Sequence, residues 1–214
     1  MIDAALAELV TAGLVRRRPP ADMLAPGSML AERGALLPLD HLRLLSLTNG
    51  LDAYGGHLRL FGVGPGGLRD MRWWNHPDGW RRTWCGRTDG WWFVGETAWG
   101  DQYAYSIPED PLQFDGAVYR LDADRMEAEP VAESFGDFLR FEIGRNAASP
   151  RCEATVAARD RFGDLDPDTQ LTYVPTLLEG GDDDPANLVA LPAGTAMALR
   201  GTAYGALLGE PASH

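Results

Sequence analysis

The side chains best suited to acid–base chemistry are two carboxylates beside the turn of an aromatic hairpin. Glu96 and Asp101 flank this turn in the stretch WWFVGETAWGDQYAYSI, residues 91–107. Paired carboxylates can serve as general acid and general base when a substrate reaches both of them. Acidic residues at a hairpin tip are ordinarily solvated, and we expect that state here. The pair alone therefore predicts no active site.

A glycine-rich stretch, GVGPGG at residues 62–67, has the letter spacing of a phosphate-binding loop. The dinucleotide fingerprint also requires a helix that opens inside the motif. Pro65 and the residues after it, LRDMRWWNHPDGW, oppose such a helix. The stretch predicts a flexible turn, and we expect no bound nucleotide or other cofactor.

An acidic segment, DLDPDTQ at residues 164–170, places carboxylates at alternate positions, as a calcium loop does. Thr169 stands where that loop needs glycine, and Pro175 stands where it needs a bidentate glutamate. GGDDDP, residues 180–185, is more typical of a charged loop than of a cation site. We expect no metal site in either segment.

The remaining candidate ligands and nucleophiles are scattered. The histidines form no close pair, and the two cysteines are in no metal-like spacing: His41, His57, His76, His214, Cys85 and Cys152. Serine is found in no G-x-S-x-G arrangement. The sequence thus predicts no catalytic residue, and the chain is expected not to be an enzyme.

Tryptophan is the residue whose distribution is most unusual. All seven lie between residues 73 and 99. Trp91 and Trp92 must face opposite sides of a strand, so we expect burial on both faces, with the alternative that one face meets a ligand. The loop before this strand mixes tryptophan with arginine, the composition of a binding hot spot. Trp80→Ala is accordingly expected to impair binding more than stability. The predicted partner-binding residues are Trp73, Trp74, Trp80, Arg81, Arg82, Trp84, Trp99 and Asp101.

The elements that must position these residues alternate between helix and strand. Hydrophobic spacing predicts a short helix near the N-terminus and another that begins at Pro38 and ends at Asn49-Gly50. Alternating patterns predict strands at 57–61, on both sides of the hairpin turn, and at 116–122. A further helix is expected over 134–144, with Ser134 as its N-cap.

These elements predict an α+β fold, an antiparallel β-sheet with helices packed at one side, plus a C-terminal extension. Residues 1–35 are interpreted as an N-terminal helix and connecting segment, and 36–148 as the main domain. Residues 149–214 are expected to pack on that same domain.

The net charge of −12 is concentrated in the second half of the chain. Residues 1–100 carry 10 acids and 11 arginines (+1), and residues 101–214 carry 21 acids and 8 arginines (−13). This balance disfavours nucleic acid and anionic membranes and favours a basic partner. The N-terminal segment has its arginines after the apolar part, unlike a signal peptide. A cytoplasmic location with unpaired thiols is expected.

The order of these motifs resembles the SMI1/KNR4 family of the SUKH superfamily. The resemblance spans residues 36 to 144 and rests on the helix ending in Asn49-Gly50, HLRLF, the aromatic hairpin, GAVYRLD and SFGDFL. It implies an α+β domain without family-wide catalytic residues. Bacterial members are thought to be immunity proteins that neutralise toxins, often nucleases, and fungal members are regulatory scaffolds.

The residues and the resemblance together predict a non-enzymatic protein-binding domain. The leading hypothesis is a bacterial immunity protein that binds a basic toxin domain. One alternative is a regulatory or scaffold module that binds a cellular protein or peptide. Another is a carbohydrate-binding module, because exposed tryptophans stack on sugar rings.

Overall fold

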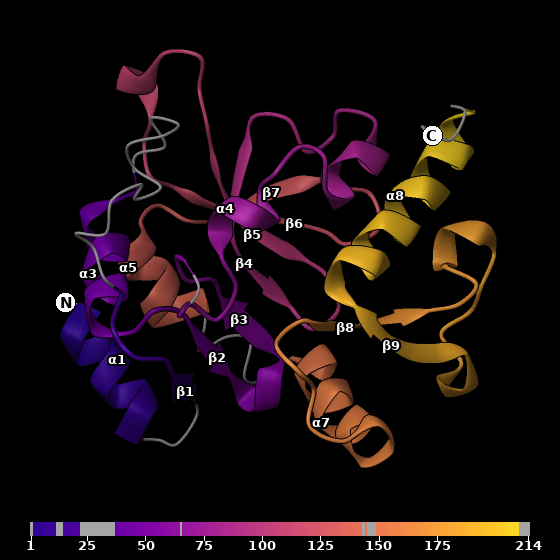
Figure 1. Cartoon of the computed structure of the whole chain (residues 1–214), viewed down its shortest axis with the longest axis horizontal. Coiled ribbons are helices and arrows are strands. Elements are labelled where there is room, and N and C mark those ends of the chain that lie inside the picture. The colour runs from indigo at the N-terminus through magenta and orange to yellow at the C-terminus, as the bar shows by residue number, and fades with distance from the viewer. Residues whose placement is uncertain are drawn as a thin grey trace.

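The computed structural model describes residues 2–11, 15–21, 37–64, 66–142, 144 and 149–209. Over these residues the chain forms a seven-stranded antiparallel sheet in which each strand pairs with its neighbours in sequence (Figure 1). The connections from β1 to β2 and from β3 to β4 are long and contain helices, whereas those between the other neighbouring strands are shorter. Its strands are β1 (Val15–Arg17), β2 (Leu51–Ala53), β3 (Leu58–Leu60), β4 (Trp91–Thr97), β5 (Gln102–Ser106), β6 (Val118–Leu121) and β7 (Ala128–Ala132).

One face of the sheet is covered by the N-terminal helix and by helices of the main domain. They are α1 (Ile2–Thr11), α3 (Leu39–Leu47) and α5 (Phe135–Asp137), which continues into the π-helical turn η4 (Phe138–Glu142). Tyr103 and Tyr105 of β5 point to this side, because Tyr103 packs 4.9 Å from Phe138 and the Tyr105 hydroxyl lies 2.9 Å from His41 Nδ1. In Figure 1 these helices lie to the left of the sheet.

The opposite face is covered by the aromatic loop and the last helix. The loop folds into α4 (Met71–Trp74) and η2 (Trp80–Trp84), and α8 (Ala193–Leu208) packs over η2. Phe93 of β4 points to this side and lies 5.3 Å from the Trp80 ring. The Trp84 indole donates to the carbonyl of Met197, 3.0 Å away, so this loop and α8 close one core.

The C-terminal segment adds a helix, a small sheet and α8. The helix is α7 (Pro150–Phe162). The small sheet has two strands, β8 (Thr169–Tyr173) and β9 (Leu188–Pro192). Leu171 of β8 donates its backbone N–H to the carbonyl of Ala98, 2.7 Å away, which ties this sheet to the main hairpin. Short 3-10 turns complete the chain: η1 (Tyr54–Gly56), η3 (Pro111–Gln113), η5 (Leu177–Glu179) and η6 (Pro185–Asn187).

The predicted α+β class with an antiparallel sheet and packed helices is confirmed. The predicted helices at the N-terminus, after Pro38 and after Ser134 are present, as are the strands at 57–61, 91–107 and 116–122. The sequence pattern did not predict β1, β2, β7, β8, β9 or α8, and the residues of β1 were interpreted as part of a connecting segment. Most of the connecting segment, residues 22–36, and Ile143 of the predicted helical stripe lie outside the described residues. Among the described helices, none combines the length and apolar character that crossing a membrane requires.

Candidate functional site

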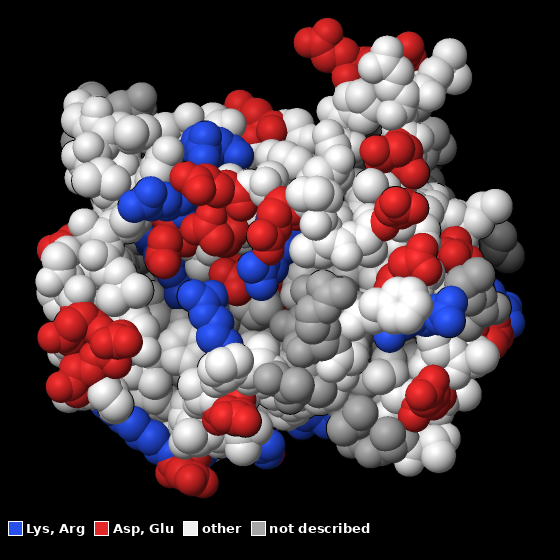
Figure 2. Space-filling model, turned by 180° about the vertical axis from the view of Figure 1, so that it is seen from behind, with Lys and Arg blue, Asp and Glu red and all other residues white. Residues whose placement is uncertain are grey.

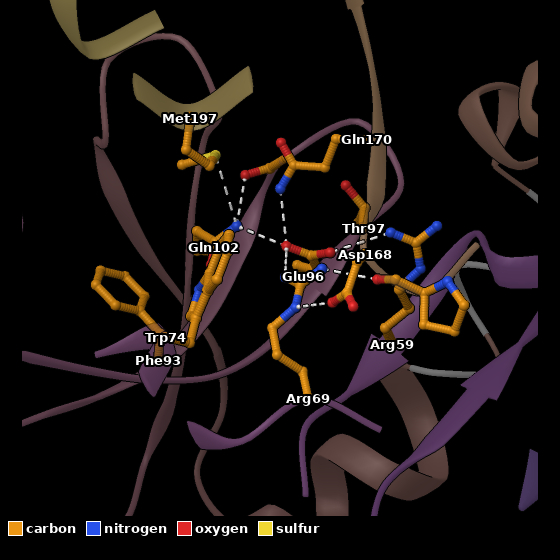
Figure 3. Close-up of polar contacts among 12 residues, drawn as sticks. Arg59, Arg69, Trp74, Phe93, Glu96, Thr97, Gln102, Asp168, Gln170 and Met197 are labelled. Carbon is orange, nitrogen blue, oxygen red and sulfur yellow. Dashed lines mark hydrogen bonds and ion pairs between the residues drawn. The ribbon is translucent and has the colours of Figure 1, made fainter. Parts of the chain in front are cut away.

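Glu96 lies fully buried at the centre of a polar network between the main sheet and the C-terminal segment (Figure 3). Its Oε1 accepts a hydrogen bond from Arg59 Nη1 at 3.1 Å. Its Oε2 forms an ion pair with Arg69 Nη1 at 2.7 Å and accepts from Gln170 Nε2 at 2.8 Å. The expectation of a solvated Glu96 is therefore wrong.

Cross-strand pairing brings the network together. Arg59 of β3 and Gln102 of β5 are the direct partners of Glu96 on the two sides of β4. Side chains of directly paired residues point to the same face of a sheet, so all three meet on the face that the C-terminal segment covers. Gln170 then reaches Glu96 from β8 of the second sheet.

The electrostatics of this site keep Glu96 ionised. Burial alone would raise the pKa of Glu96, but the charges of Arg69 and Arg59 outweigh it and hold the pKa below its ordinary value. A general acid or base works best with a pKa near the operating pH. Glu96 is thus suited to holding the two arginines in place.

Arg69 connects this buried network to the surface. Its guanidinium carbon lies 4.1 Å from the centroid of the Trp74 ring and 5.0 Å from that of Phe61. Its Nε donates to Asp168 Oδ1 at 3.3 Å, and its Nη2 donates to the carbonyl of Pro167 at 2.7 Å. The side chain is therefore fixed between two aromatic rings and two carboxylates.

Asp101 and Trp99 are structural residues of the hairpin turn. Asp101 is buried; its Oδ1 accepts from the Ala123 amide at 3.0 Å and its Oδ2 from Arg151 at 2.8 Å. Trp99 is also buried, and its indole donates to Thr155 Oγ1 at 3.0 Å. Both side chains are therefore buried and not exposed as predicted partner contacts would be, because α7 and the rest of the C-terminal segment fold over the turn.

The turn is closed from above by α8. A Cβ at Gly100, whose φ is +93°, would lie 2.5 Å from Arg200 Nη1. Arg200 is itself buried and donates to Gln170 Oε1 at 2.9 Å and to the carbonyl of Leu171 at 2.8 Å. The hairpin tip is thus an internal junction, which explains why its acids are not solvated.

The predicted exposed Trp-Arg loop is mostly core. Trp74, Trp80 and Trp84 are buried, so the prediction that they form a surface hot spot is wrong. The physical reason is that α4 and η2 fold back on the sheet, where the Trp80 indole donates to the carbonyl of Trp74 at 3.1 Å. Arg81 is half-buried and donates to the carbonyl of Asn75 at 2.9 Å. Of the eight predicted residues, Trp73 and Arg82 are exposed.

The two strand tryptophans differ in burial. Trp92 is buried, and Trp91 is half-buried, with its ring 5.2 Å from that of Tyr119. The expected burial is therefore complete on the Trp92 face of β4 and partial on the Trp91 face.

The described residues of the GVGPGG stretch are held by hydrogen bonds and by a close backbone contact. The Asn49 side chain forms two hydrogen bonds with the backbone of Val63: its Nδ2 donates to the carbonyl at 2.9 Å, and its Oδ1 accepts from the amide at 2.8 Å. A Cβ at Gly62 would lie 2.5 Å from the carbonyl of Asn49. The glycine is required for this close approach, and Asn49 does more than end a helix.

A groove of about 450 Å³ opens between this glycine loop, α4 and the start of α8. Its walls include Leu68, Arg69, Asp70, Trp73, Asp168 and Gly194. Trp73 is 66% exposed, in contrast to its buried neighbour Trp74. The groove is therefore a concave surface that joins an exposed indole to the outer end of the buried network.

Sequence reasoning missed the residues that build this centre: Arg59, Arg69, Gln102, Gln170 and Arg200. A signal was present in the strand patterns, where Arg59 and Glu96 interrupt otherwise apolar segments. A charge inside an apolar strand requires a partner, but the partner's identity depends on tertiary structure. Within the described residues, no group of three or more His, Cys, Asp or Glu side chains could hold a metal ion.

No protein-family model matches the sequence, and the search of curated proteins gives no match. Among solved structures, the chain is similar to the crystal structure of Atu4351 from Agrobacterium tumefaciens, with a TM-score of 0.60 and 12% identity. The match covers 91% of this chain and 88% of that chain, so it takes in most of the C-terminal extension. At this identity the similarity shows a shared fold.

Proposed function

We propose that this chain is a cytoplasmic protein-binding domain of the SMI1/KNR4 (SUKH) kind, which acts without catalysis as an immunity protein and neutralises a basic toxin domain. The observation that carries the proposal is the division of charged groups. The buried ones hold one another, whereas acidic side chains crowd the outer surface.

The buried groups support a structural role. Glu96 is held by Arg59 and Arg69, and Asp101 by Arg151. Each carboxylate thus has a cationic partner from the same chain. A substrate would have to displace these partners to reach either acid, which favours binding at the surface over chemistry inside.

The surface supports a basic partner. Figure 2 shows acidic side chains gathered on the face seen from behind, with fewer basic ones among them. At the turn from β6 to β7, Glu127 and Glu129 are exposed, and Asp122 and Asp124 are partly exposed. Clustered charge of one sign accelerates association with an oppositely charged protein.

Co-expression with toxins encoded near this gene tests the proposal. The expected result is survival of the cells and a stable complex between purified chain and toxin, with an association rate that falls as salt is added. If the neighbouring toxins kill equally well with and without this chain, and bind it at no salt concentration, the proposal is wrong.

A regulatory module that binds a cellular peptide is a second candidate, favoured by the groove beside Trp73. Pull-down from cells that lack toxin genes separates the two. A dedicated immunity protein should recover little from such cells, whereas a regulatory module should recover one partner in stoichiometric amount.

A further inference from the structure

We infer that the groove beside Trp73 receives an arginine side chain of the partner protein. The inference rests on the proposed function for the nature of the partner, a basic protein. It adds the place of contact and the chemical group that is recognised there.

The shape of the groove suits a long side chain with a flat end. Its volume of about 450 Å³ is bounded by Leu68 and Trp73 on the main domain and by Gly194 on α8. Trp73 lines this concavity and keeps 66% of its surface exposed, so its indole is accessible for stacking. An arginine places a hydrocarbon stem on apolar walls and a planar guanidinium on an aromatic ring.

The charge at the rim suits a cation. Asp168 lines the groove, and 74% of its side chain remains exposed although Oδ1 contacts Arg69. Asp70 lines it as well; its Oδ1 accepts from the Arg72 amide at 3.0 Å, and its Oδ2 lies 3.5 Å from Arg72 Nη2 in a partly exposed ion pair. Two carboxylates beside an exposed indole match the electrostatic and geometric preferences of guanidinium.

The interior of the protein already contains an arginine held by a tryptophan ring and a carboxylate. The Arg69 guanidinium lies 4.1 Å from the Trp74 ring centroid and pairs with Glu96 at 2.7 Å. The Trp73 and Trp74 rings are neighbours, with centroids 6.3 Å apart. The groove thus presents a second tryptophan, with Asp70 and the exposed part of the Asp168 carboxylate beside it, outside the site that already holds Arg69.

An anion is the competing occupant, because Arg69 and the N-terminus of α8 carry positive charge. Glu96 and Asp168 neutralise the Arg69 guanidinium. The first amide of α8, on Ala193, donates to the carbonyl of Asp168 at 2.6 Å. The groove is lined by the carboxylates of Asp70 and Asp168 against the single guanidinium of Arg69, so the balance of charge favours a cation.

NMR of the ¹⁵N-labelled chain tests this inference through the indole N–H signals. The probes are N-acetyl-arginine, N-acetyl-lysine and N-acetyl-glutamate methylamides, with inorganic phosphate and maltohexaose as further ligands. The arginine probe should shift the Trp73 indole signal saturably at millimolar concentrations. Lysine should bind more weakly, and the others should leave the signal in place. A stronger response to phosphate, glutamate or the sugar would overturn the inference.

Matched variants separate groove binding from general attraction. Trp73→Ala and Asp168→Asn should each weaken arginine binding by about two- to fivefold. The Trp73→Ala titration is followed by backbone amide signals of residues 66–70. Leu112→Ala, which trims another exposed side chain, and Asp183→Asn, which removes another exposed charge, should change nothing. Equal weakening by Asp183→Asn and Asp168→Asn would show that net charge alone is responsible.

The outcome for the groove is distinguishable from that for the proposed function. A toxin that binds Trp73→Ala as tightly as the native chain would refute the groove and leave the immunity function standing. Saturable arginine binding at Trp73 in a chain that neutralises no toxin would retain the groove and refute that function.

Discussion

Glu96 carries a charge inside the protein because arginines on two separate segments meet it there. Arg59 comes from β3, and Arg69 comes from the segment before α4. Removing one partner from a buried ion pair leaves the others uncompensated, which costs more than the pair contributes. The single residue therefore controls a junction of three chain segments.

Glu96→Gln should lower the free energy of unfolding by about 3–5 kcal/mol, because two buried guanidinium groups lose their shared carboxylate. Urea denaturation followed by tryptophan fluorescence measures this. Glu109→Gln, at an exposed position, is the control and should change stability by less than about 0.5 kcal/mol. A neutral result for Glu96→Gln would mean that water or a rearranged Asp168 replaces the lost charge.

Trp80→Ala should destabilise the fold by about 3–5 kcal/mol, as large aromatic truncations in a core do. The expectation from sequence was the opposite, since the loop composition indicated a surface. Trp73→Ala, in the neighbouring element α4, removes an exposed ring and should change the free energy of unfolding by less than about 0.5 kcal/mol. Thermal unfolding of both variants checks the contrast, and equal melting temperatures would contradict the burial of Trp80.

His41 makes stability depend on pH. Burial lowers its pKa to about 3, with its Nδ1 2.9 Å from the Tyr105 hydroxyl and its ring stacked 4.1 Å from Phe135. In the unfolded chain the imidazole titrates near its ordinary 6.5. Between these two pH values the unfolded state binds a proton that the folded state does not. The contribution of His41 to the free energy of unfolding is therefore fully present above pH 6.5 and is lost as the pH decreases toward 3.

Between pH 7 and pH 4.5 this linkage should remove about 2–3 kcal/mol of unfolding free energy. Urea titrations at the two pH values measure it. Glu96 acts in the same direction at lower pH, because its pKa is also lowered in the fold. His41→Gln should flatten the profile over this range, whereas His76→Gln, at an exposed position, should leave it unchanged. An unchanged slope in His41→Gln would assign the acid sensitivity to other groups.

At the scale of elements, strands with a clear alternation could be predicted and α8 could not. The stretch AGTAMALRGTAYGALL has no strong helical stripe because small residues face η2. A Cβ at Gly201 would lie 2.3 Å from Thr83 Oγ1 and 2.9 Å from the carbonyl of Thr83. The small residues that weakened the helical signal are those that allow the helix to approach so closely.

Gly201→Ala should therefore destabilise the protein by about 1–3 kcal/mol, although alanine is the better helix former. The clash with a backbone carbonyl cannot be relieved by rotating a side chain. Gly194→Ala is the matched control, because a Cβ there meets nothing within 4 Å. It should be neutral or stabilising by up to about 1 kcal/mol. Denaturant midpoints of both variants decide whether α8 packs as closely as described.

At the scale of the whole molecule, the polar network around Glu96 could not be predicted from sequence because its members are far apart along the chain. Glu96 and Gln170 are 74 residues apart, and Arg69 and Asp168 are 99 apart. Local periodicity reports which face of an element is buried, but not which segment covers it. The fold class thus followed from short-range patterns, whereas the site depends on how the C-terminal segment docks.

This docking makes the extension part of the core. Ala193 and Met197 belong to the same hydrophobic cluster as Trp74, Trp80 and Phe93. A chain that ends at residue 148 would leave this aromatic face and Glu96 open to solvent. We expect that truncated chain to aggregate or to lack a cooperative unfolding transition, while a chain that ends at residue 209 should unfold like the full-length protein. A sharp, reversible transition in the shorter chain would instead show that residues 36–148 fold alone and that the extension is an accessory.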